Sequence, residues 1–121
     1  MVVGILRVVL SLPWNDSLKG KRSVVKSIIE RARVRFHVAA AEVDDLDQHR
    51  RATLGFAVVS NDARHAGQVL DKLRGFIAGA SEAQLVDQSR SIEHYDGLGG
   101  GGLGLDSDWD DDDDGDDEEE E

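Results

Sequence analysis

Carboxylates gather near the middle of the chain, and such a cluster is what general acid-base catalysis or a divalent metal ion would use. Its members are Glu42, Asp44, Asp45 and Asp47. Three of them fall where we expect a hairpin turn. Asx-type bonding within that turn and pairing with Arg50 or Arg51 account for the acids without chemistry. We therefore interpret the cluster as structural and predict that the chain is not an enzyme.

The other residues suited to catalysis or metal binding are scattered. The four histidines, at positions 37, 49, 65 and 94, have neither helical metal-ligand spacing nor a nucleophile placed by a motif. The sequence has no cysteine, which excludes disulfides, thiolate metal sites and cysteine nucleophiles. We predict no metal site, no cofactor and no small-molecule substrate.

Two pattern matches in the C-terminal part are rejected. Residues Asp110 to Glu121 satisfy the calcium-loop pattern, but a run of acids meets it by chance, and no flanking helices are expected. The glycine run GLGGGGLGLD contains no GK[ST] and leads into no helix, so it is not a phosphate-binding loop.

A basic ridge is the strongest binding feature. Projected at about 100° per residue, Lys19, Arg22, Lys26 and Arg33 lie on one flank of an expected helix. Lys21 lies near the start of that helix, where free backbone N–H groups and the helix dipole also favour an anion. These five residues are the predicted nucleic-acid-binding site, with a phosphate backbone as partner. The alternative is a solvated helix face whose long side chains cover the edge of the core.

The outer face of the expected sheet favours a protein partner over RNA. RNA-recognition motifs carry aromatic residues on the outer faces of their first and third strands. Here the corresponding positions hold mostly small apolar residues, and the charged residues among them are Arg7 and Arg51. The predicted interface residues are Val3, Ile5, Val9, Ala57 and Val59. This surface suits another protein surface, including a second copy of the chain.

Hydrophobic periodicity predicts six elements. Alternation predicts strands at residues 2–12, 37–43, 51–60 and, more weakly, within 84–92. Spacing of i, i+3, i+4 and i+7 predicts two helices, with Gly79 as a stop for the second. The predicted N-cap of the first is Asp16 or Ser17, and that of the second is one of Ser60, Asn61 and Asp62. The order β-α-β-β-α-β predicts an α+β, ferredoxin-like split sandwich, with both helices on one face of a four-stranded antiparallel sheet.

Charge divides the chain into two parts. Residues 1–95 hold all 14 Lys and Arg against 11 acids, a net charge of +3, and are predicted to form one domain. Residues 96–121 hold 14 acids and no base, a net charge of -14, and are predicted to be a glycine-rich linker and a disordered acidic tail. No signal peptide or membrane helix is expected, and we predict a cytoplasmic protein.

Four segments carry a family resemblance: VGILRVVLSLP, SLKGKRSVVKSIIERARVRF, AEVDD and LGFAVVSND. Together they resemble the YlxP-like family of small bacterial proteins over roughly residues 1–93. The resemblance implies a ferredoxin-like fold, a setting among genes for translation initiation and ribosome maturation, and no catalytic residue. The chain departs from the family at Gly20, where a charged residue is more common, and in its acidic tail.

These observations lead to one expected function and one alternative. The first is a non-catalytic accessory protein of the translation apparatus that contacts ribosomal RNA or a ribosome-bound factor through the basic ridge. The alternative is a homodimeric interaction module that uses the outer sheet face and binds no nucleic acid.

Overall fold

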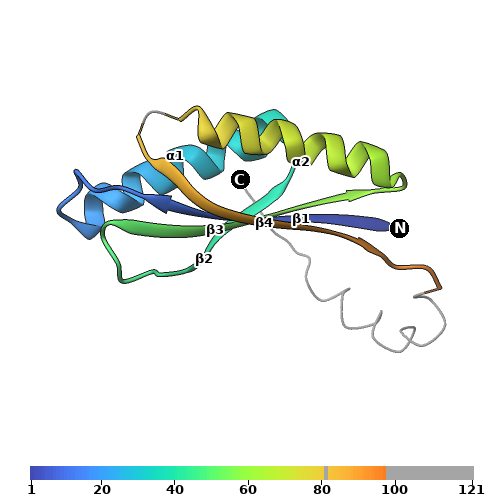
Figure 1. Cartoon of the computed structure of the whole chain (residues 1–121), viewed down its shortest axis with the longest axis horizontal. Coiled ribbons are helices and arrows are strands. Elements are labelled where there is room, and N and C mark those ends of the chain that lie inside the picture. Colours follow the sequence, from blue (N-terminus) through green and yellow to red (C-terminus); the bar gives the residue numbers. More distant parts are fainter. Residues whose placement is uncertain (81, 98–121) are drawn as a thin grey trace, which may run out of the picture.

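The computed structural model describes residues 1–80 and 82–97, which form two helices and four strands (Figure 1). In chain order the elements are β1 (Val2–Ser11), α1 (Leu18–Phe36), β2 (Ala39–Asp44), β3 (Arg51–Ser60), α2 (Ala63–Ala78) and β4 (Gln84–His94). This confirms the predicted order. The predicted linker and tail lie outside the described residues from position 98 onward.

The strands form one antiparallel sheet in the order β2-β3-β1-β4. β1 lies at the centre, with Leu6 opposite Phe56 of β3 and opposite Arg90 of β4. Both helices cover the same face of the sheet (Figure 1). The fold is therefore the predicted ferredoxin-like split sandwich.

Strand alternation determines which side chains enter the core. In β1 and β3 the even-numbered residues up to Val58 are buried against the helices, as predicted. Leu6 and Leu54 are fully buried, and Phe56 is 2% exposed. The helices contribute the apolar stripes that face these strands, including Ile28 and Ala32 of α1 and Leu70 and Leu73 of α2.

Helix capping explains where the two helices begin. The Oγ of Ser17 accepts a hydrogen bond from the Gly20 N–H at 3.0 Å. Asp62 does the same for α2, because its side chain accepts from the Arg64 N–H at 3.0 Å. Both residues are among the predicted caps, and Gly79 ends α2 as expected.

The boundaries of β2 and β4 differ from the prediction. Residue 37 does not begin β2, because His37 adopts a left-handed conformation (φ 55°, ψ 47°) and its N–H donates to the Arg33 carbonyl, ending α1. β4 continues beyond residue 92 because it pairs along the whole of β1, with His94 opposite Val2. Backbone pairing with a long central strand is not visible in the local pattern of β4.

Candidate nucleic-acid interface

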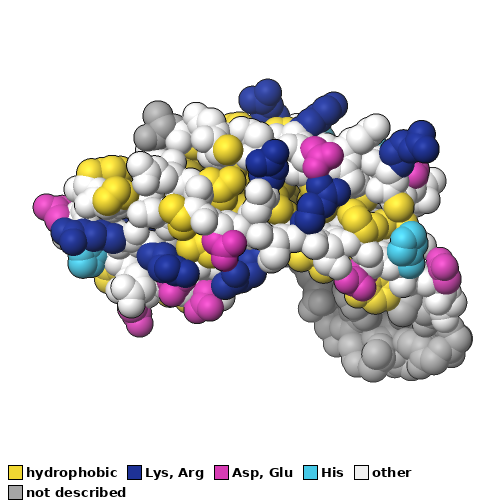
Figure 2. Space-filling view, in the orientation of Figure 1, with side chains coloured by type: hydrophobic (Ala, Val, Ile, Leu, Met, Phe, Trp, Pro, Cys, Tyr) yellow, Lys and Arg dark blue, Asp and Glu magenta, His cyan; other side chains and the backbone are white. Residues whose placement is uncertain are grey.

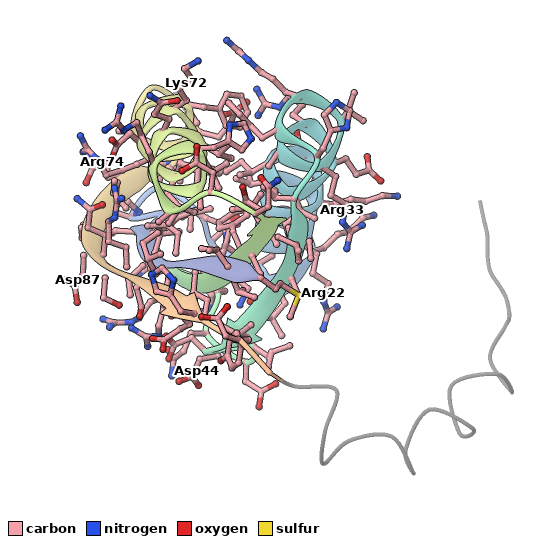
Figure 3. The ribbon with its side chains drawn as sticks, turned by 90° about the vertical axis from the view of Figure 1, so that its right-hand side faces the viewer. Arg22, Arg33, Asp44, Lys72, Arg74 and Asp87 are labelled. Atoms are coloured by element: carbon pink, nitrogen blue, oxygen red, sulfur yellow. The ribbon has the colours of Figure 1, made fainter. Side chains whose placement is uncertain are left out.

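Three of the predicted ridge residues line one groove between α1 and the edge strand β2. Arg22, Lys26 and Arg33 stand along this groove, whose volume is about 410 Å³. Arg22 and Arg33 project from the flank of α1 that faces away from α2 (Figure 3). Lys19 lies exposed in the first turn of α1, outside the groove lining. We call Lys19, Arg22, Lys26 and Arg33 the basic ridge.

The charges of the basic ridge are available to a ligand. Among the described residues, none of the four forms an ion pair. Two acids, Glu30 and Glu42, also line the groove, but Glu42 is paired with a buried lysine. The local balance is therefore positive, and all four ridge side chains are exposed.

Arg33 connects the ridge to the sheet edge. Its guanidinium donates to the Ala40 carbonyl of β2 at 2.7 Å. Because β2 is an edge strand, carbonyls on its free side have no strand partner. Arg33 thus covers part of the open edge, and a polyanion along the ridge would meet a guanidinium already held in place.

Lys21 corrects the sequence prediction, because it is fully buried and cannot contact nucleic acid. Its Nζ lies 2.8 Å from Glu42 Oε2 and donates to the carbonyls of Asp45 (2.8 Å) and Leu46 (3.1 Å). The contact with Glu42 is an ion pair without well-aligned hydrogen-bond geometry. Lys21 therefore fastens α1 to β2 and to the turn that follows it.

The acidic cluster is divided among structural partners. Asp44 accepts from the Asp45 N–H at 2.8 Å, and Asp45 accepts from Thr53 Oγ1 at 2.6 Å and from Arg51 Nε at 3.1 Å. The Thr53 hydrogen bond, helped by Arg51, lowers the pKa of Asp45 below its ordinary value of 3.8. The ionised Asp45 carboxylate therefore stabilises the folded state above pH 3.8, and this contribution is lost as the pH falls further.

Gly20 and Trp14 also have structural roles. A Cβ atom on Gly20 would lie 2.2 Å from the Oδ1 of Asn15, a buried side chain that donates to the carbonyls of Ser17 and His49. Glycine at position 20 therefore permits the loop before α1 to pack closely. Trp14 is 59% exposed, and its indole N–H donates to the Glu82 carbonyl at 3.0 Å, which connects the loop before α1 to the segment before β4.

The outer sheet face presents four of the five predicted interface residues to solvent. Ile5 is 39% exposed and Val59 67%, while Val3 and Ala57 are partly exposed. Val9 is only 1% exposed, which corrects its place in the predicted interface. Its cross-strand partner Thr53 is also buried and is bonded to Asp45, so the turn after β2 covers this end of the face.

Comparison with known sequences places this geometry in a family. Residues 3–90 match the family described as "Protein of unknown function (DUF503)". The chain belongs to this family. A DUF503 match of that length covers every strand and helix of the fold except the first residue of β1 and the end of β4.

The DUF503 chain also resembles a curated bacterial relative. It is 34% identical over 61 residues to "Uncharacterized protein YlxP" of Bacillus subtilis (strain 168). The match covers 50% of this chain and 66% of that relative's own length. The resemblance inferred from the four sequence segments is thereby confirmed.

Among solved structures, a de novo designed protein with a ferredoxin fold, determined by solution NMR, is similar to this chain. The similarity covers 81% of this chain and 89% of the designed one, with 11% sequence identity and a TM-score of 0.46.

Neither helix in the described residues combines the length and apolar character that a bilayer-spanning helix requires. The described residues also contain no group of three or more His, Asp or Glu arranged to hold a metal ion.

Proposed function

We propose that this chain is a non-catalytic accessory protein of the translation apparatus, acting in the cytoplasm, that contacts RNA through the basic ridge. The observation that carries the proposal is the groove between α1 and β2. Three exposed cations line it, and none of them is neutralised by an ion pair within the described part of the chain. The setting in translation is supported only by the family resemblance.

RNA is the partner that this surface favours. Phosphates repeat along a flexible single strand, and three guanidinium or ammonium groups along one helix flank match a row of such charges. The strands offer no aromatic platform for bases, since the exposed residues of the outer sheet face are aliphatic, hydroxyl-bearing or charged. Binding should therefore follow charge more than base sequence.

The test measures fluorescence anisotropy of a labelled single-stranded RNA as a function of salt. Replacing Arg22 and Lys26 together by Glu should weaken binding, and the slope of log affinity against log salt should fall by about 1.4 if two phosphate contacts are lost. Arg74→Glu is the control, with its effect compared per reversed charge, because Arg74 is exposed on the flank of α2 away from α1 (Figure 3). Equal weakening by both charge reversals would contradict a specific role for the ridge.

A homodimer through the outer sheet face is the second candidate. The observation that favours it is the exposure of Ile5 and Val59 on adjacent strands, on one face of the sheet. Val43 adds to the same surface, because it lies over Gly55 and is 52% exposed. Apolar side chains exposed together on one face are typical of surfaces that pair.

A further inference from the structure

A second hollow lies between the C-terminal end of α1 and the face of α2 that is turned toward it. Its volume is about 770 Å³, and the end of β3 forms part of its floor. It shares no lining residue with the groove of the basic ridge. Nothing in the sequence patterns singled it out, because its residues come from three separate elements.

Basic groups surround this hollow. Arg35 reaches it from the last turn of α1 and His37 from the C-cap that follows, and His65 and Lys72 reach it from α2. None of the described residues that line it is acidic. The C-terminal end of α1 contributes about half a negative charge, which the two full cations Arg35 and Lys72 outweigh. The hollow therefore favours an anion.

The same hollow has an aromatic and aliphatic wall. The rings of Phe36 and Phe76 meet edge to face, with centroids 5.6 Å apart. The guanidinium of Arg35 lies over both rings, 5.4 Å and 5.6 Å from their centroids. Arg35 is thus a cation held in position beside apolar surface, which reduces the entropy lost when it binds a charged group.

His37 occupies a backbone conformation that glycine would adopt with less strain. Its φ of 55° and ψ of 47° are left-handed, and the residue that ends a helix in this way is most often glycine. The left-handed conformation costs a residue with a Cβ free energy. The chain nevertheless places an imidazole here, at the rim of the hollow.

We propose that this hollow binds a nucleoside monophosphate, either free or as the terminal nucleotide of an RNA. The phosphate lies among Arg35, Lys72, His65 and His37, and the flat base lies against the aliphatic part of the wall, at Val59 and Val69. The charged and apolar parts of the hollow match the two halves of such a ligand. This site does not depend on RNA binding by the basic ridge, because the two share no residue.

The experiment titrates AMP into the isotope-labelled full-length chain and follows backbone amide shifts by NMR. Saturable shifts are expected at Arg35, His37, His65 and Lys72, with inorganic phosphate and adenosine each binding more weakly than AMP. Lys72→Glu should weaken AMP binding by about fivefold or more. Arg74→Glu is the control, since it makes the same change of charge on the same helix outside the hollow. If both variants weaken AMP binding equally, the attraction is diffuse and the proposal is wrong.

Gly75→Leu provides a second test that does not alter charge. Gly75 lines the hollow, and a Cβ added there meets no atom within 4 Å, so the variant should fold and should partly fill the site. Loss of AMP binding with an unchanged or higher melting temperature is expected. The arm with an RNA that begins with a 5′-monophosphate distinguishes the two ligand sources. Tighter binding of this RNA than of AMP, lost in Gly75→Leu, assigns the site to RNA ends, and no saturable binding of either probe refutes it.

Discussion

Lys21 is a charged residue in the interior of the fold, and its ammonium has more acceptors than protons. Glu42 provides one charge, and the carbonyls of Asp45 and Leu46 provide two further contacts, with the Arg51 carbonyl at 3.4 Å. A buried ammonium is tolerated when acceptors replace its water. Its role follows from this network: α1, the edge strand β2 and the turn after it are held together by one side chain.

Replacing Lys21 by Met should destabilise the fold by about 3 kcal/mol, because the carboxylate of Glu42 and the carbonyls lose their donor. Lys21→Arg should also be less stable than the wild type although it keeps the charge, because the planar guanidinium has a different shape from the ammonium. Urea unfolding measures both variants. A second substitution, Glu42→Leu, should recover part of the loss in Lys21→Met. A change below about 1 kcal/mol in Lys21→Met would contradict the network.

The burial of Lys21 could have been predicted from the sequence. Positions 21, 25, 28, 29 and 32 share the helical stripe that is buried in α1, and Lys21 begins it. A lysine on an apolar stripe indicates a buried ion pair, and Glu42 is the only acid in the predicted strand 37–43. The close approach of Asn15 to Gly20 could not have been predicted, because it depends on the path of a loop.

At the scale of elements, hydrophobic alternation predicted the strands well where one face is buried throughout. β3 matches its predicted bounds of residues 51–60, and the inward residues of β1 are those that alternation identifies. Alternation also placed Val9 on the outer face. It did not predict that Val9 is buried there, because that burial depends on the turn after β2. Local periodicity identifies the face of a strand, whereas coverage by a distant segment depends on tertiary structure.

If the outer face of the sheet pairs two copies, Ile5→Glu should convert a dimer into a folded monomer, because it places charge in an apolar interface. Analytical ultracentrifugation at several concentrations measures this, with circular dichroism as the check on folding. Arg7→Glu on the same strand is the comparison variant, because it changes the charge of the face but removes no apolar side chain. A wild-type chain that is monomeric at every concentration would exclude this dimer.

At the scale of the whole molecule, basic side chains stand along the helical layer, as Figure 2 shows on one face. The C-terminal residues 96–121 carry 14 acids and no base. A chain with these two parts contains both the basic ridge, for which polyanion binding is proposed, and a polyanion. Tethering brings them together at an effective concentration of roughly millimolar order.

We expect the acidic residues to compete with RNA for the basic ridge. Truncation after Tyr95 should therefore strengthen RNA binding at low salt, and Lys26→Glu with Arg33→Glu should cancel the gain. The difference should shrink near physiological salt, where screening shortens the reach of exposed charges to about 8 Å. Equal RNA affinity of full-length and truncated chains at low salt would show that the acidic residues serve another purpose.

Cosedimentation with small ribosomal subunits tests most directly the proposal that the basic ridge serves translation. The wild-type chain should pellet with the subunits at low and moderate salt, Arg22→Glu with Lys26→Glu should remain in the supernatant, and Arg74→Glu should behave as wild type. Binding that survives treatment of the subunits to remove exposed RNA would indicate a ribosome-bound protein as the partner. A wild-type chain that never pellets, or a ridge variant that pellets as well as wild type, would contradict the proposed function.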